Sequence, residues 1–115
     1  MKFTPVQIEI ETVLCAVGGC GTKKGFTGII WGVSFALEDP AMLYAVTKDL
    51  YPAIADAMGM NMQAILRDMR ALVTWCWDFG DREMLNRVAG RKLLDKPSVG
   101  EFIDMLAGYL RRNGF

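Results

Sequence analysis

The stretch LYPAIADAMGMNMQAILRDMRALVTWCWDFG, residues 50–80, predicts two helices joined by a tight turn. A short helix ends at Met58, because the glycine that follows, Gly59, takes the positive φ that stops a helix sharply. A longer amphipathic helix follows. Ala55 is small enough for two helices to touch, and Ile65 is apolar enough to anchor the second helix. The stretch therefore predicts a helix-turn-helix at about residues 51–79.

The longer helix is expected to divide into an apolar inner stripe and an outer or flanking set of residues. The inner stripe is Ile65, Met69, Leu72, Val73 and Cys76. The residues on or near the outer side, which are the candidate DNA contacts, are Asn61, Gln63, Ala64, Arg67, Asp68, Arg70 and Ala71.

The chemistry of these candidates suits DNA. Arginine presents a fork to guanine N7 and O6 in the major groove, or a charge to phosphate, and Asn61 and Gln63 have amides that suit an adenine edge or a phosphate. The alternative is that Arg67 and Arg70 are solvated or paired with a neighbouring acid such as Asp68. The residues alone leave both interpretations open.

The rest of the chain predicts further helices. Apolar spacing indicates helices at about 5–17, 26–37 and 41–50, although TGIIWGVSF, residues 27–35, also has the composition of a strand. A short helix follows Asp81, and a capping box of Ser98 and Glu101 begins a last helix. We expect an all-α, compact bundle of about six to seven helices containing the helix-turn-helix, in one domain over residues 1–115.

Several terminal and aromatic residues have structural explanations. Arg111 and Arg112 suit the dipole at the C-terminal end of the last helix. Trp75, Trp77 and Phe79 are expected to pack in the core, because single-strand binders combine their aromatic residues with a strongly basic groove.

Composition and charge limit the possible functions. The chain has 115 residues, of which 52% are hydrophobic and 23% charged, as in a folded globular domain. The net charge is zero, which is less basic than most DNA-binding modules. Residues 61–115 carry nine basic against seven acidic residues, so we expect an anionic partner on that half. Arg91, Lys92 and Lys96 form either a phosphate-contacting loop or an ordinary exposed loop.

No metal, cofactor or enzyme activity is expected. The chain has no histidine, and Cys15, Cys20 and Cys76 are expected to be buried or part-buried free thiols. Lys23 and Lys24 stand beside glycines, but the GxxxxGK[ST] order of a phosphate-binding loop is missing. No nucleophile motif or catalytic carboxylate pair is present.

No membrane segment is expected either. The longest apolar run, residues 26–37, is shorter than the roughly 20 residues that cross a bilayer. The N-terminus lacks the apolar core of a signal peptide. We therefore expect a cytoplasmic protein.

Four segments taken together resemble the C-terminal effector domain of the stage-zero sporulation protein A family, the master sporulation response regulators. They are KGFTGIIWGVSFALEDP, AVTKDLYPAIA, AILRDMRALVTWCWDFG and KPSVGEFIDMLAGYLR, and the resemblance spans residues 8–112. It implies a roughly six-helix domain that binds promoter DNA in the major groove, in tandem, to activate or repress transcription. It also implies that Arg67 and Arg70 are recognition-helix arginines and that Lys24 lies near a basic position before the second helix.

The chain departs from the family pattern in ways that bear on function. Leu66 stands where the family has a glutamate on the recognition helix. Ala64 stands where the family has an arginine, and Ala71 replaces a polar residue. The family also carries a receiver domain, for which we expect no room here. The expected function is a stand-alone DNA-binding transcriptional regulator.

The alternative is a protein-interaction module that has lost specific DNA binding and modulates a full-length regulator. Zero net charge favours this alternative, and so do Leu66 and Ala64, which are expected on the DNA-reading face of the longer helix. Eight methionines also favour it as an adaptable contact surface, although each methionine is individually expected to fill the core.

Overall fold

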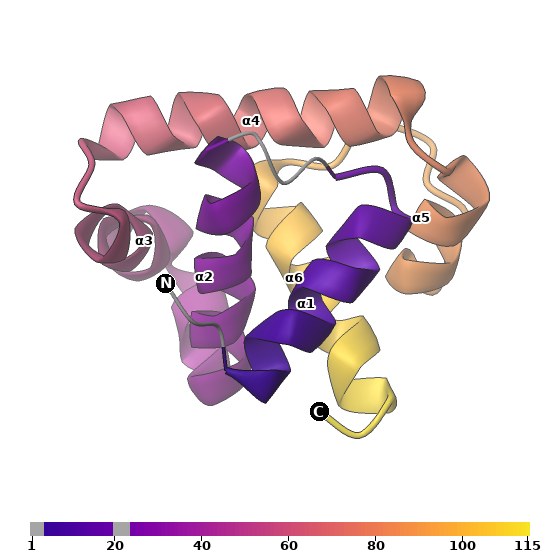
Figure 1. Ribbon diagram of the computed structural model, residues 1–115, viewed down its shortest axis with the longest axis horizontal. Helices are drawn as coiled ribbons and strands as arrows, with labels where there is room; N and C mark the ends of the chain where they lie inside the picture. Colours follow the sequence, from indigo (N-terminus) through magenta and orange to yellow (C-terminus); the bar gives the residue numbers. More distant parts are fainter. Residues whose placement is uncertain (1–3, 20–23) are drawn as a thin grey trace.

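The computed structural model describes residues 4–19 and 24–115, and within these ranges the regular structure is entirely helical (Figure 1). The expected all-α fold is therefore confirmed, and the strand alternative for residues 27–35 is wrong. In chain order the elements are α1 (Pro5–Ala16), α2 (Lys24–Glu38), η1 (Pro40–Tyr44), η2 (Val46–Leu50), α3 (Tyr51–Met58), α4 (Met62–Phe79), α5 (Arg82–Ala89) and α6 (Val99–Arg112).

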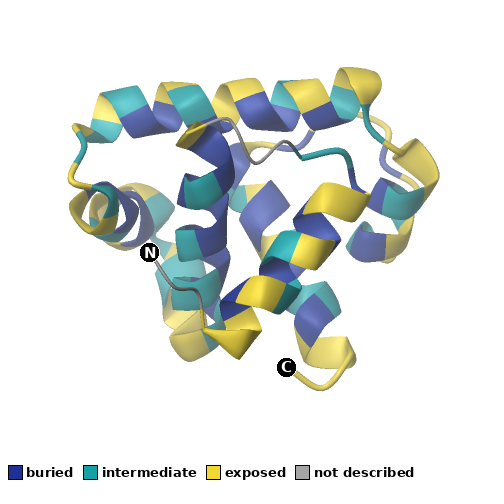
Figure 2. Cartoon of the chain, viewed as in Figure 1, coloured by how far each residue is buried: buried dark blue, intermediate teal, exposed yellow. Residues whose placement is uncertain are grey.

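Helix α2 lies at the centre of the bundle and contacts α1, α3, α4 and α6. The helices turn their buried faces toward one another, and α4 crosses one side of the molecule with its exposed residues outward (Figure 2). The start of α2 approaches α4 very closely at Gly25, where a Cβ atom would collide with the carbonyl oxygen of Asp68. Only glycine allows this approach, which sets Lys24 beside α4.

The expected helix at about 41–50 is wrong. This segment consists of a 3₁₀-helix, η1, and a single π-helical turn, η2. Asp39 caps η1 by accepting a hydrogen bond from the Ala41 N–H at 3.2 Å, and Ala45, at φ −142° and ψ 63°, interrupts the helical path. Leu50 at the end of the segment is fully buried, but Leu43 and Val46 are only partly buried, so packing along the segment does not impose one regular helix.

Both ends of α6 are tied down. The predicted capping box is confirmed, because the Glu101 N–H donates to Ser98 Oγ at 3.1 Å and the Ser98 N–H donates to Glu101 Oε1 at 3.2 Å. At the other end, Arg111 donates to the Ala36 carbonyl at 2.6 Å and Arg112 to the Val88 carbonyl at 3.0 Å. These two arginines therefore join α6 to α2 and α5, beyond the favourable dipole interaction expected from the sequence.

The described cysteines differ from each other. Cys76 is buried as expected, whereas Cys15 lies exposed on α1, whose inner face is formed by Gln7, Ile10, Val13 and Leu14. The expectation of a buried or part-buried thiol at Cys15 is therefore wrong, and Cys20 lies outside the described residues. Among the described helices, none combines the length and apolar character needed to span a membrane.

Candidate DNA-binding surface

Helices α3 and α4 form the helix-turn-helix. Gly59 takes φ 61° and ψ 34°, which is left-handed, and the Met60 N–H closes the turn on the Ala55 carbonyl at 3.0 Å. Ala55 is 7% exposed and Ile65 is fully buried, so the small and apolar inner positions predicted from the sequence are occupied as expected.

Asn61 caps the start of α4. Its side-chain oxygen accepts hydrogen bonds from the Gln63 N–H at 2.8 Å and from the Ala64 N–H at 3.4 Å. Two amides that would otherwise lack a partner are thereby satisfied. In the free protein, the side-chain oxygen of Asn61, a candidate DNA contact, is therefore already used to cap α4.

The inner face of α4 contains one residue more than predicted. The five expected residues are buried, and Leu66, which is 9% exposed, lies with them. Leu66 is three residues before Met69 and seven before Val73, the spacing that keeps residues on one side of a helix. The prediction that Leu66 stands on the DNA-facing side is therefore wrong.

Gln63, Arg67 and Ala71 follow one another at four-residue intervals and are exposed, so we define them as the outer face of α4. Arg67 Nε lies 3.6 Å from Asp68 Oδ1, but 76% of the Arg67 side chain is exposed to solvent. Such an ion pair contributes little to stability and leaves the guanidinium accessible. Ala64 and Asp68 lie half-buried at the edge of this face.

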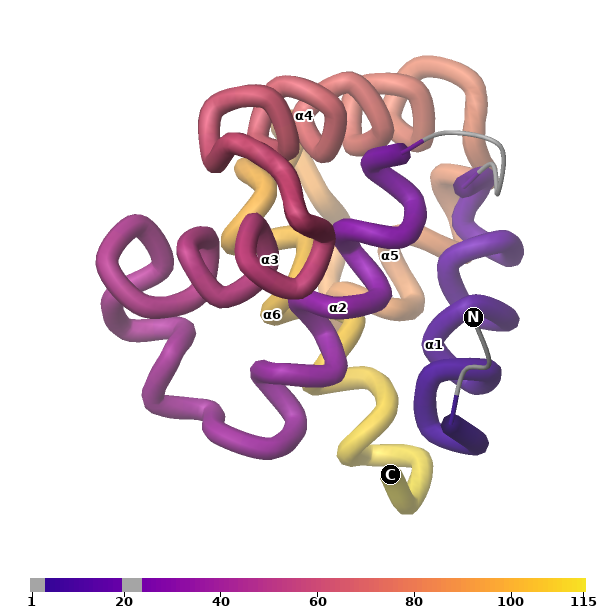
Figure 3. The backbone as a smooth tube through the Cα atoms, turned by 60° about the vertical axis from the view of Figure 1, so that its left-hand side comes forward, coloured from indigo at the N-terminus to yellow at the C-terminus, as the bar shows by residue number. Residues whose placement is uncertain are grey.

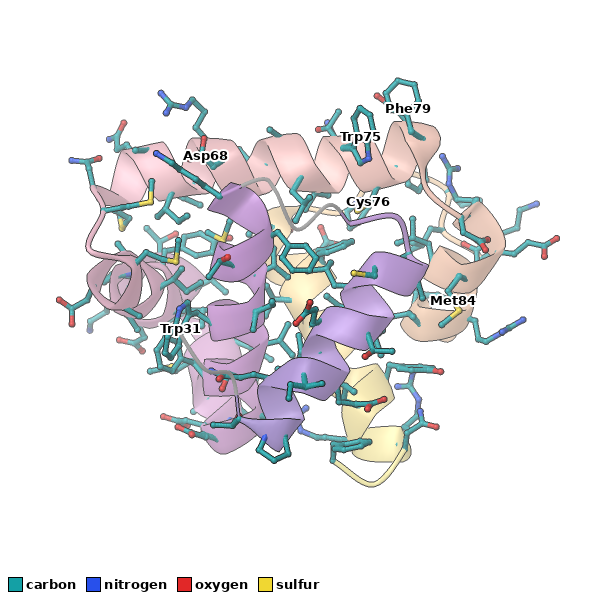
Figure 4. The ribbon with its side chains drawn as sticks, viewed as in Figure 1. Trp31, Asp68, Trp75, Cys76, Phe79 and Met84 are labelled. Carbon is teal, nitrogen blue, oxygen red and sulfur yellow. The ribbon has the colours of Figure 1, made fainter. Side chains whose placement is uncertain are left out.

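One flank of the outer face is formed with α2. Lys24 lines a shallow depression of about 370 Å³ together with Arg67, Asp68 and Ala71. Figure 4 shows Asp68 above the start of α2. The structure therefore brings Lys24 to α4, although Lys24 and Arg67 are 43 positions apart in the sequence.

The opposite flank is formed with the start of α6. Arg70, Thr74, Lys96 and Ser98 line a second depression of about 390 Å³, and Lys96 Nζ donates to Thr74 Oγ1 at 3.0 Å. Tyr51 forms the inner wall. Burial raises the pKa of Tyr51, and a hydrogen bond with the Gly100 backbone and the charge of Arg70 only partly offset this effect.

The other two loop candidates lie elsewhere. Arg91 lines a depression of about 250 Å³ with Asp104 and Arg112, between α5 and α6. Lys92 is exposed in the loop after α5. The structure gathers Lys24, Arg67, Arg70 and Lys96 around α4 but does not bring Arg91 to them. The sequence offered Lys96 only as one member of a basic loop, because its place beside Thr74 depends on how that loop packs.

The C-terminal half of α4 exposes two aromatic rings, Trp75 and Phe79, which are 42% and 71% exposed and which we call the aromatic pair. Their ring centroids lie 4.7 Å apart, and both project outward from α4 (Figure 4). Core packing is therefore the wrong prediction for these two residues. Trp77 does pack partly against the core, with the Arg82 guanidinium 3.4 Å from its ring centroid.

A short helix packed against a longer one, whose accessible outer face lies between basic flanks, defines the molecule as a helix-turn-helix domain. Residues 10–110 match the family model described as sporulation initiation factor Spo0A C terminal. Because this match covers most of the 115 residues, the chain belongs to that family. This match confirms the resemblance seen in the sequence. The family comprises DNA-binding transcription regulator domains of sporulation and is not a family of enzymes.

Proposed function

We propose that this chain acts as a stand-alone transcriptional regulator that binds promoter DNA with α4 in the major groove. One observation carries the proposal: the exposed outer face of α4 lies between two basic flanks, Lys24 on one side and Arg70 with Lys96 on the other. The major groove, about 12 Å wide, admits one helix and is bordered on both sides by phosphates. Cations on both flanks of a helix match this arrangement.

The proposed base contacts come from the outer face. Arg67 stands at its middle and suits guanine N7 and O6, because its weak ion pair with Asp68 is readily exchanged. Gln63 suits an adenine edge, and the Ala71 methyl group suits a thymine methyl group. Lys24, Arg70 and Lys96 are assigned to phosphates, which hold the helix in place but specify no sequence.

The salt dependence of a gel-shift titration tests the proposal. A promoter fragment from the source genome should be bound with log K falling against log salt, with a slope of about −0.9 for each phosphate neutralised. Lys24→Ala and Lys96→Ala should each make the slope shallower by about 1. Lys48→Ala, an exposed lysine on η2, is the matched control and should leave the slope unchanged. Undetectable or salt-insensitive binding would refute the proposal.

The regulator is proposed to work in the cytoplasm, with residues 1–115 forming one domain. Its proposed partners besides DNA are a second copy on an adjacent site or a full-length regulator. Titration of promoter fragments with one or two sites, followed by analytical ultracentrifugation, distinguishes single from tandem occupancy.

A single cooperative unfolding transition is expected for one domain.

The second candidate function is a protein-interaction module, and the aromatic pair favours it. The methionines do not, because every methionine in the described residues packs in or against the core: Met42, Met58, Met60, Met62, Met69, Met84 and Met105. Co-purification with a full-length regulator, together with no shift of any promoter fragment, would support this function over DNA binding.

A further inference from the structure

A groove of about 630 Å³ lies where the start of α1, the second half of α2 and Phe115 meet. This end of the molecule is remote from α4, as the two views of the backbone agree (Figures 1 and 3). Trp31 and Phe35 form an aromatic wall, with ring centroids 5.7 Å apart and planes inclined by 26°. Val6 and Phe115 also line the groove, and both are partly exposed.

One polar side chain in this apolar groove is almost completely buried. Gln7 is 5% exposed, and its Oε1 accepts a hydrogen bond from the Thr4 N–H at 3.0 Å in the capping box of α1. Because this end of the Gln7 amide accepts a hydrogen bond, it is the oxygen, and the other end is the nitrogen Nε2. No described residue accepts a hydrogen bond from Nε2. Since no fully buried side-chain nitrogen in the described residues lacks a partner, Nε2 keeps some exposure, and Gln7 is one of the residues that line the groove.

We propose that this groove binds a small, neutral, mainly aromatic molecule with a carbonyl oxygen. The aromatic wall provides stacking, and Gln7 Nε2 provides a donor for the carbonyl. A volume of about 630 Å³ lies within the range of small-molecule sites, about 300 to 1,000 Å³. The Glu38 carboxylate at the rim disfavours an anionic ligand.

This site is separate from the proposed DNA-binding surface. Helix α2 runs from Gly25, which touches α4, to Glu38 at the groove, so the two sites lie at opposite ends of one helix (Figure 1). A ligand in the groove therefore leaves the outer face of α4 open to DNA. The ligand site can be tested whether or not the chain binds DNA.

The test uses prodan, a neutral fluorescent aromatic ketone, titrated into the 115-residue chain. We expect saturable binding of one molecule per chain, with a blue-shifted emission. Gln7→Glu keeps the acceptor of the capping box but removes the donor, and should weaken binding about tenfold. Glu101→Gln is the matched control, because it makes the reverse exchange in the capping box of α6, and its affinity should equal that of the original chain.

A second variant and a map of the bound site complete the test. Ser34→Phe fills the groove and should abolish binding, with circular dichroism checking the fold; if this variant unfolds, the Gln7 and Glu101 pair decides. Amide chemical shifts should change at residues 4–7 and 31–38. The proposal is overturned by non-saturable binding, by equal affinities of Gln7→Glu and Glu101→Gln, or by shifts confined to the aromatic pair.

Discussion

The two halves of α4 share one inner face but differ on the outside. The N-terminal half presents Gln63, Arg67 and Ala71 between basic flanks, whereas the C-terminal half presents Trp75 and Phe79 beside the exposed Asp78. At 1.5 Å per residue, Arg67 and Phe79 lie about 18 Å apart along the helix, which exceeds the roughly 12 Å width of the major groove. One helix therefore presents two separate surfaces of different chemistry, of which we propose that the N-terminal one binds DNA.

The largest expected effect tests whether Leu66 belongs to the inner or the outer face of the N-terminal half of α4. Leu66→Ala should lower the free energy of unfolding by about 3 kcal/mol, because it opens a cavity in the core. Guanidinium denaturation measures this loss, and the folded variant should keep its DNA affinity. Leu94→Ala, at a position that is 81% exposed, is the control and should change stability by less than about 0.5 kcal/mol. A stable Leu66→Ala variant with altered DNA affinity would move Leu66 to the DNA-facing side.

The next effect separates the outer face from the rest of the surface. Arg67→Ala should weaken binding to the preferred promoter site by about 2 kcal/mol if the guanidinium contacts a base. Fluorescence anisotropy with matched and single-base-changed sites measures both the loss and the relaxed preference. Arg87→Ala, an exposed arginine on α5, should bind as the original chain does. Equal losses from both substitutions would show only a general electrostatic attraction.

A smaller effect concerns the core beneath the C-terminal half. Burial raises the pKa of Cys76 from 9.0 to about 11. From pH 9 to 10 the unfolded chain loses this proton while the folded chain keeps it, so the free energy of unfolding should fall as pH rises, by about 1 kcal/mol. Denaturation at pH 8, 9 and 10 measures the slope, and Cys76→Ala should flatten it. An unchanged slope in that variant would assign the pH dependence to other groups.

The smallest effect concerns the aromatic pair. Phe79→Ala should change stability by less than about 0.5 kcal/mol and leave DNA affinity unchanged, because the side chain is 71% exposed and lies beyond the half of α4 that we propose to face DNA. Thermal unfolding and anisotropy measure the two quantities. Trp77→Ala, which removes a ring packed partly against the core and against Arg82, should destabilise the fold and is the contrasting variant. A clear loss of DNA affinity in Phe79→Ala would join the two halves into one surface.

The helices that the sequence predicted well are those with strong periodicity and clear ends. The capping box at Ser98 and the left-handed Gly59 act locally, so the sequence reveals them directly. The prediction of one helix at residues 41–50 was wrong because their apolar spacing resembles that of a helix, while only Leu50 at the end of the segment is fully buried. A local pattern does not reveal how much of a short segment the core will cover.

The sequence predicted the residues in the middle of the inner and outer faces of α4, but it misplaced residues at the borders between these faces. Each residue turns a helix by 100°, so the borders of an apolar stripe depend on the neighbouring helices, and both Leu66 and Trp75 lie at such borders. The partnership of Lys96 with Thr74 spans 22 residues and depends on a loop that propensity does not place. The sequence therefore predicted the helix-turn-helix motif, but it did not predict contacts between residues far apart in the chain.

The two arginines at the end of α6 have a consequence for biosynthesis. Arg111 reaches a carbonyl 75 residues earlier in the chain and Arg112 one 24 residues earlier, and α6 itself packs against α1, α2, α4 and α5. Of the described helices, α6 is the last to be synthesised. Until α6 emerges from the ribosome, the earlier helices lack the surface that closes their core, so we expect this bundle to complete its folding only after α6 has emerged.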